Sequence, residues 1–124
     1  MFDLYELISK IRKRPAMYLG QISISNLRTF LAGYCFARRQ MGMPQTPQEQ
    51  QFSQFQSWIQ EKINQTSNQT WDQIILSFSQ DQQTALQTFF NLFDEFIQTE
   101  NIDELKSNQT NNLKVASGTQ EGKR

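Results

Sequence analysis

The sequence contains no histidine among its 124 residues and only one cysteine, Cys35. Without histidine, the chain lacks the side chain that serves most often as a general base and as a metal ligand near neutral pH. A single cysteine cannot form a disulfide within the chain, so the fold makes no demand on an oxidising compartment. We expect the Cys35 thiol to be buried and unreactive. The sequence therefore predicts a protein that is not an enzyme and that holds no metal ion and no cofactor.

Long hydrophobic runs are also absent, because the chain has no stretch of 18 apolar residues that would span a membrane. The chain begins MFDLYE, with acidic residues where a secretory signal peptide would carry basic ones. These two features predict a cytoplasmic protein without a membrane segment.

Glycine and proline are few, with five and three residues, and they separate segments of helical periodicity. Hydrophobic residues make up 37% of the chain and include ten phenylalanines, which is enough for one core at this length. No segment shows the alternation that is typical of a strand. We predict helices over about 3–14 and 23–41, and further helices that begin at Thr46, Thr70 and Ser79.

Local signals mark the starts of these helices. Asp3 with Glu6 resembles a capping box, and Thr46 is followed directly by a proline and, three residues on, by Glu49. Gly33 stands in the middle of the second predicted helix, where glycine costs roughly 1 kcal/mol relative to alanine. We interpret Gly33 as a position at which another helix approaches closely.

These patterns predict an all-α fold, a compact bundle of about five helices. Residues 1–105 would form a single helical domain. Residues 106–124 are rich in Ser, Asn, Gln and Gly and hold few apolar side chains. Such a segment buries too little surface to offset its ordering entropy, so we expect it to be a disordered polar tail.

The segment from Arg14 to Gly20 is the most distinctive part of the sequence. The residue before a proline avoids helical geometry, so the first helix should end at Arg14. Gly20 supplies a second break. We predict a structural turn in which Pro15 ends the helix, Met17 and Tyr18 fill the core, and Gly20 permits the next bend.

Residues 12–20, RKRPAMYLG, resemble the RKRPGMYIG stretch near the start of the ATPase domains of type II topoisomerases of the gyrase B class. In that family the next helix carries acidic and asparagine residues that hold the catalytic water and magnesium. Here residues 26–34 contain no acid, and no Gly-x-Gly motif occurs anywhere in the chain. This local resemblance therefore implies a similar turn and not ATP binding.

A second resemblance covers about residues 8–97. It joins the same turn to a series of aromatic, glycine and aliphatic positions: Arg14, Pro15, Met17, Tyr18, Leu19, Gly20, Ser23, Leu27, Phe30, Leu31, Gly33, Tyr34, Phe52, Phe55, Trp58, Ile59, Trp71, Phe89, Phe90 and Phe93. Their order is similar to that in a group of small, uncharacterised bacterial all-helical proteins with an RPxMYLG turn. This chain departs from them at Ala16, where glycine is the more familiar residue. Some members resemble immunity proteins of polymorphic toxin systems, which implies the inhibition of a toxin domain.

Charges of opposite sign separate along the chain, although the net charge is zero. Residues 1–42 carry seven basic and two acidic side chains, a net charge of +5. Residues 43–105 carry nine acidic side chains and one basic, a net charge of −8, and the remainder carries +3. A separation of this kind bears on the partners of a protein rather than on its fold.

A basic run closes the first predicted helix and gives one candidate surface, for an anion or a nucleic acid. Its members are Lys10, Arg12, Lys13 and Arg14, with Arg28 from the next helix and with Arg38 and Arg39 as additions. The same cations also suit the macrodipole at a helix C-terminus and cover apolar surface with their stems. The two interpretations stay open.

Acidic residues gather near the end of the fifth predicted helix and give the other candidate surface: Asp94, Glu95, Glu100, Asp103 and Glu104. Acids at this end of a helix oppose its macrodipole, so another use is expected. They could meet a basic surface on a partner or dock against the basic part of the chain itself. A solvated acidic face is the simpler alternative.

We therefore predict a non-catalytic protein-binding domain. Its most concrete form is an immunity or antitoxin-like inhibitor whose acidic helical face occludes the active site of a toxin. One alternative is a nucleic-acid or anion-binding module that uses the basic run. Another is a homodimeric helical protein of structural role, whose aromatic face supplies the dimer core: Phe89, Phe90, Phe93 and Phe96.

Overall fold

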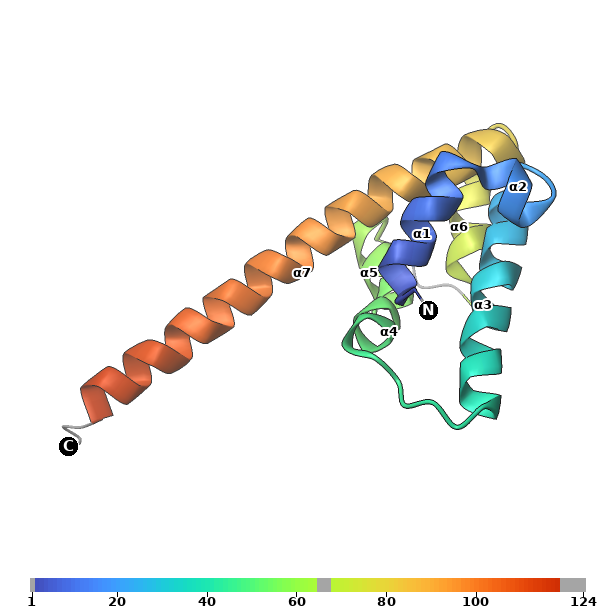
Figure 1. Ribbon diagram of the computed structural model, residues 1–124. Coiled ribbons are helices and arrows are strands. Elements are labelled where there is room, and N and C mark those ends of the chain that lie inside the picture. The colour runs from blue at the N-terminus through green and yellow to red at the C-terminus, as the bar shows by residue number, and fades with distance from the viewer. Residues whose placement is uncertain (1, 65–67, 119–124) are drawn as a thin grey trace. The chain divides into compact units, whose positions relative to one another are not determined.

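The computed structural model describes residues 2–64 and 68–118, with the backbone alone for residues 102–118. This part of the chain contains helices and no strand, so the predicted all-α fold is confirmed (Figure 1). The helices are α1 Leu4–Lys13, α2 Pro15–Leu19, α3 Ile24–Gln40, α4 Pro47–Phe52, α5 Phe55–Lys62, α6 Trp71–Ser77 and α7 Gln82–Gly118.

Local hydrogen bonds raise the number of helices above the predicted five. The predicted turn folds into the short helix α2, in which Pro15 takes the first helical position. The predicted third helix is interrupted and becomes α4 and α5. At the interruption the Ser53 hydroxyl donates to the Gln50 carbonyl at 2.5 Å, and the Gln54 N–H donates to the Gln51 carbonyl at 3.0 Å. Bonds of this short range compete with the helical ladder.

Capping explains most of the helix starts. Thr46 with Glu49 and Thr70 with Gln73 form capping boxes, the two pairs with which the sequence predicts that these helices begin. Asp3 caps α1, and its carboxylate accepts from the first helical N–H at 2.8 Å. Each cap satisfies backbone donors that the helix itself leaves without a partner.

The start predicted at Ser79 is wrong. The Ser79 hydroxyl donates to the Ile75 carbonyl at 2.7 Å and so belongs to the end of α6. Asp81 precedes α7, and its carboxylate accepts the Thr84 N–H at 2.7 Å. Serine and aspartate are both good caps, and the deciding factor is that the Ser79 side chain is already engaged with the preceding helix.

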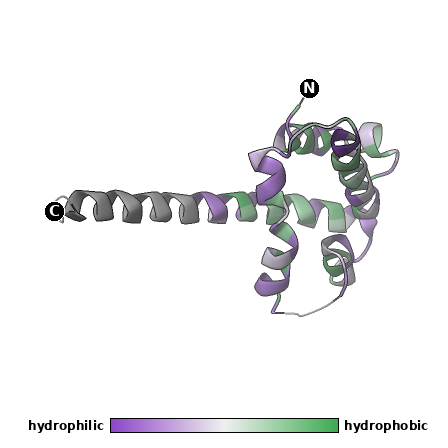
Figure 2. Ribbon diagram, turned by 90° about the horizontal axis from the view of Figure 1, so that it is seen from below, coloured by the Kyte–Doolittle hydropathy of each residue, from purple (hydrophilic) through white to green (hydrophobic). Residues whose placement is uncertain are grey.

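The contacts divide the chain into a first unit, residues 1–92, and a second unit, residues 93–124. In the first unit α3 packs on α6, α6 on α5, and α1 on both α2 and α4. Aromatic rings from these helices form its core: the Phe55 ring centroid lies 5.5 Å from those of Trp71 and Phe89. Figure 2 shows both hydrophobic and hydrophilic residues within the helices of this unit, as expected of amphipathic helices.

The second unit comprises the C-terminal part of α7 and the residues that follow it. Its backbone is helical as far as Gly118, and residues 119–124 lie outside the described residues. The predicted domain over 1–105 and the predicted disordered tail over 106–124 stay predictions.

Arg38 holds the loop between α3 and α4 in place through contacts of its side chain. Its guanidinium forms an ion pair with Glu49 at 2.5 Å and donates to the Pro44 carbonyl at 3.0 Å. Both charged side chains are almost wholly buried, with 10% and 8% exposed. The expectation that Arg38 adds to a basic surface is therefore wrong, because burial leaves its charge facing Glu49.

Candidate functional site

The N-terminal segment is held against α3 by two contacts of Phe2. The Tyr34 hydroxyl donates to the Phe2 carbonyl at 2.6 Å. The Lys10 Nζ lies 4.6 Å from the centroid of the Phe2 ring, within the range of a cation–π contact. The Phe2 ring is nevertheless 39% exposed, so it lines a surface and does not fill the core.

This arrangement opens a hollow with a volume of about 750 Å³ between the N-terminal segment and α3, which we call the apolar groove. Its lining residues are Phe2, Leu7, Thr29, Phe30, Gly33 and Tyr34. Thr29 and Tyr34 bear the only hydroxyl groups among them, and that of Tyr34 is engaged with the Phe2 carbonyl. The groove thus presents mainly hydrocarbon and aromatic surface.

Gly33 forms a notch in the wall of the apolar groove. A Cβ added at Gly33 would meet no heavy atom within 4 Å. The interpretation that another helix approaches closely at this position is therefore wrong. Glycine here leaves space open to the surface, and a larger side chain would fill it.

A second, smaller hollow lies where α1 meets α2, with a volume of about 270 Å³, and we call it the basic hollow. It is lined by three cations and two apolar or aromatic residues: Lys10, Lys13, Arg14, Met17 and Tyr18. Met17 is 61% exposed, so the expectation that it fills the core is wrong. The helix α2 that replaces the predicted turn points Met17 outward, while Tyr18 is half-buried. Gly20 ends α2 with a φ of 78°, which confirms that it breaks the helix.

Two contacts join the basic hollow to the apolar groove. Lys10 lines the hollow and lies over the ring of Phe2, which lines the groove. Tyr18 lines the hollow, and its ring meets that of Phe30 edge-to-face with centroids 6.4 Å apart. The two hollows therefore form one continuous surface with an apolar part and a basic part.

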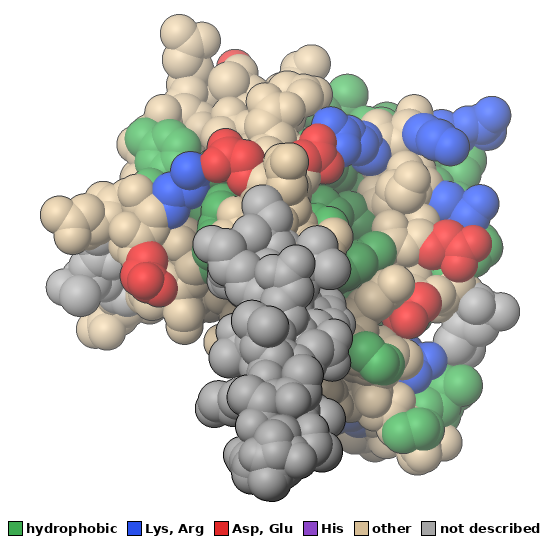
Figure 3. All heavy atoms as spheres, turned by 90° about the vertical axis from the view of Figure 1, so that its left-hand side faces the viewer, with side chains coloured by type: hydrophobic (Ala, Val, Ile, Leu, Met, Phe, Trp, Pro, Cys, Tyr) green, Lys and Arg blue, Asp and Glu red, His purple; other side chains and the backbone are tan. Residues whose placement is uncertain are grey.

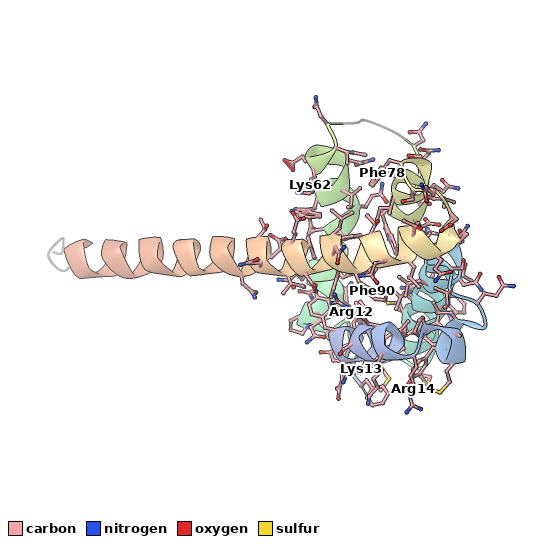
Figure 4. The ribbon with its side chains drawn as sticks, turned by 90° about the horizontal axis from the view of Figure 1, so that it is seen from above. Arg12, Lys13, Arg14, Lys62, Phe78 and Phe90 are labelled. Carbon is pink, nitrogen blue, oxygen red and sulfur yellow. The ribbon has the colours of Figure 1, made fainter. Side chains whose placement is uncertain are left out.

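The five basic residues that the sequence suggests as one anion site do not lie together. The Arg12 guanidinium lies 5.3 Å from the centroid of the Phe90 ring of α7, and Arg28 pairs with Asp72 at 3.3 Å. Figure 4 shows Arg12 beside Phe90, whereas Lys13 and Arg14 lie farther from α7. The predicted patch is thus reduced to the three cations of the basic hollow.

The acidic candidates lie in the second unit. Asp94 and Glu95 are exposed and Glu100 is half-buried, whereas the side chains of Asp103 and Glu104 lie outside the described residues. With about 100° of rotation per residue, Asp94, Glu95 and Glu100 point in three different directions from the helix axis. Their use as a single binding face stays a prediction.

On another face of the molecule the two signs of charge are mixed. On the face shown in Figure 3, acidic and basic side chains lie among one another in the coloured part, with hydrophobic side chains between them. That face offers an extended macromolecule no continuous area of one sign.

Two titratable side chains near the groove hold their protons more tightly than usual. Burial raises the pKa of the Tyr34 phenol, whose hydroxyl donates to the Phe2 carbonyl. Burial likewise raises the pKa of the Cys35 thiol, so the nucleophilic thiolate is scarce at neutral pH.

In the part of the chain that the structure describes, histidine, cysteine and carboxylate side chains form no group of three that could hold a metal ion. No helix among these residues is both long and apolar enough to cross a membrane. Comparison with protein families, with curated proteins and with solved structures finds no match to this chain. Function therefore has to be inferred from the geometry of the site.

Sequence reasoning missed the apolar groove. Its signals were Gly33 in mid-helix and a phenylalanine at position 2, outside the first helix. Neither signal distinguishes a notch from a close contact, because that distinction depends on which residues face them from elsewhere in the chain.

Proposed function

We propose that this chain is a non-catalytic protein-binding domain that receives a segment of another protein in the apolar groove. The observation that carries the proposal is the groove itself, about 750 Å³ of mainly apolar surface left unfilled at Gly33. Contiguous apolar surface of this kind on a folded domain marks interaction sites. Grooves bounded by helices commonly take the apolar face of a partner segment.

The lining of the groove favours a protein segment over a small polar ligand. Small-molecule sites place several polar groups so that they converge on the ligand. Here the Tyr34 hydroxyl is engaged with Phe2, and Thr29 is the other hydroxyl of the lining. An apolar side chain is the better complement to such a wall.

The finer form of the proposal is an immunity or antitoxin-like inhibitor in the cytoplasm. Its support is the resemblance of about residues 8–97 to small bacterial proteins, together with the single cysteine, which makes no demand on an oxidising compartment. In this form the bound segment belongs to a toxin domain, and the inhibitor blocks it by occupying its surface.

The test is capture of partners from native lysate by the tagged full chain, with nuclease treatment of every sample. A Cβ at Gly33 would meet no heavy atom within 4 Å, so Gly33→Leu, which places a larger apolar side chain in the notch, should fold. Ser57→Leu adds the same side chain at an exposed position on α5 and serves as the matched control. We expect Gly33→Leu to lower the recovery of a stoichiometric partner by roughly tenfold or more, as loss of a central anchor does.

Equal recovery by wild type and Gly33→Leu would refute binding through the groove. Recovery that nuclease abolishes would favour a nucleic-acid partner instead. For the inhibitor form, the captured partner is expressed alone and with this chain: relief of its toxicity by wild type but not by Gly33→Leu is the expected result.

A further inference from the structure

We infer that the bound segment is an amphipathic α-helix with acidic residues toward one end, whose apolar face lies in the apolar groove and whose carboxylates lie at the basic hollow. The inference rests on the proposed protein-binding function and adds the chemistry of the partner. Its basis is the continuity of the two hollows and the difference in their chemistry.

The continuity places the charged and apolar contacts within reach of one ligand. Lys10 and Tyr18 of the basic hollow touch Phe2 and Phe30 of the apolar groove through the contacts described above. A segment that follows the groove toward these aromatic rings therefore arrives at Lys10.

The basic hollow specifies the sign of the charge. Its three cations come from one turn of α1 and the residue that follows, and none of its lining residues is acidic. Of the other nearby cations, Arg12 lies on Phe90 and Arg28 pairs with Asp72. Complementary charge at the rim of an apolar contact raises the association rate and selects the partner.

The shape of the groove favours a helix. The lining positions on α3 are 29, 30, 33 and 34, which lie on one side of the helix because 29 and 33, 30 and 33, and 30 and 34 are three or four residues apart. No heavy atom lies within 4 Å of the place where a Cβ at Gly33 would stand, so the notch leaves room for a side chain of the partner as a central anchor. Helical segments enter such grooves with apolar residues three and four positions apart.

A nucleic acid fits these observations less well. Its affinity for protein comes largely from many phosphate contacts, whereas the hollow supplies three cations. The apolar groove beside them has no cation to continue the phosphate contacts along a strand. The same surface complements a protein segment that is acidic at one end and apolar along one face.

The experiment uses the full-length chain and two fluorescein-labelled helical peptides of about 18 residues, long enough to hold a helix. Both carry leucines spaced three and four apart, and one carries glutamates near one end where its twin carries glutamines. We expect the glutamate peptide to bind wild type about five- to tenfold more tightly at low salt. The advantage should shrink as salt screens the charges.

Variants of the protein test whether the preference for the glutamate peptide comes from the basic hollow. Replacing Lys10, Lys13 and Arg14 by glutamine should abolish the advantage of the glutamate peptide. Arg39→Gln removes an exposed cation outside the hollow and should preserve it. Gly33→Leu should weaken both peptides to a similar degree, because it blocks the apolar contact that they share.

These measurements distinguish a failure of this inference from a failure of the proposed function. Equal affinity for the two peptides overturns the inference, and loss of both in Gly33→Leu would then still support protein binding. A wild-type dimer that Gly33→Leu dissociates also overturns it, since the occupant would be a second copy. Binding of a labelled oligonucleotide that the triple glutamine variant abolishes, and that Gly33→Leu leaves unchanged, overturns it in favour of nucleic acid.

Discussion

At the scale of single residues, the pair of Arg38 and Glu49 is the clearest case of a charge whose role depends on burial. Arg38 stands in the last turn of α3, where a cation also suits the helix dipole. Glu49 belongs to the capping box of α4 and accepts the Thr46 N–H at 3.3 Å while it pairs with Arg38. One carboxylate therefore serves both the start of α4 and the end of α3.

The exchange Arg38→Met is expected to lower the free energy of unfolding by about 3 kcal/mol, because it leaves the Glu49 carboxylate buried without its cation. Urea denaturation followed by circular dichroism measures the change. Arg39→Met, at the exposed neighbouring position, should alter stability by no more than about 0.5 kcal/mol. If the two variants changed the free energy of unfolding by similar amounts, the ion pair between Arg38 and Glu49 would contribute nothing to stability.

The capping of α7 by Asp81 predicts that the stability of the protein depends on pH. Hydrogen bonds from the Thr84 and Gln83 N–H groups lower the pKa of Asp81 below its ordinary value. A carboxyl whose pKa falls on folding stabilises the native state above its unfolded pKa, and this contribution is lost as the pH falls through the folded pKa. We expect Asp81→Ala to be less stable than wild type at pH 7, with the difference closing at acid pH.

Thermal unfolding of both proteins between pH 7 and pH 2.5 measures this difference. Asp81→Asn keeps a side-chain acceptor for the Thr84 N–H without the charge, so it should recover part of the stability at pH 7. A gap between wild type and Asp81→Ala that stays constant over the whole range would contradict the linkage.

At the scale of the helices, glycine has opposite consequences at two positions. Gly20 ends α2 with a positive φ of 78°, which residues with a Cβ adopt only under strain. Gly33 has ordinary helical geometry within α3, and nothing fills the space beside it. Backbone conformation requires the first glycine, whereas the second costs stability and leaves the notch.

We therefore expect Gly33→Ala to raise the free energy of unfolding by about 0.5–1 kcal/mol, through the better helix propensity of alanine. Gly20→Ala should lower it by about 1–2 kcal/mol through backbone strain. Denaturant titration of the two variants beside wild type gives both values. A loss of stability in Gly33→Ala would mean that another part of the chain occupies the notch.

The helices themselves were largely predictable, because their signals are local. The positions of Asp3, Thr46 and Thr70 before apolar periodicity mark helix starts through hydrogen bonds that span one to three residues. The prediction failed where two local signals competed, at Ser79 against Asp81, and at Ser53, whose hydroxyl bonds within its own turn. Such competition is decided by the neighbouring helix and not by the capping residue alone.

At the scale of the whole molecule, the sequence predicts that the last part of the chain contributes little to stability. The core of the first unit is formed by residues between Leu4 and Leu92, and residues 106–124 hold few apolar side chains. Stability follows buried apolar area, so a chain that ends at Leu105 should unfold within about 0.5 kcal/mol of the full chain.

Urea denaturation of the two lengths checks that equality, and the far-ultraviolet circular dichroism of the same samples reports how much helix the removed residues contribute. A clear loss of stability in the shorter chain would contradict the predicted polar tail. If stability is unchanged while the helical signal falls, residues 106–118 form helix but add nothing to the free energy of unfolding.

The sequence alone determined the fold class and most helix starts, because periodicity, caps and breaks act over three or four neighbouring residues. Tertiary structure decided the site. Arg28 and Arg38 look like surface cations in the sequence, yet each pairs with a carboxylate from another helix. Lys10 gains its role from its place over Phe2, and Gly33 from the space beside it. Contacts between different elements of the fold have no local signature in the sequence, so only packing separates a cation that is paired within the chain from one that is left to bind a partner.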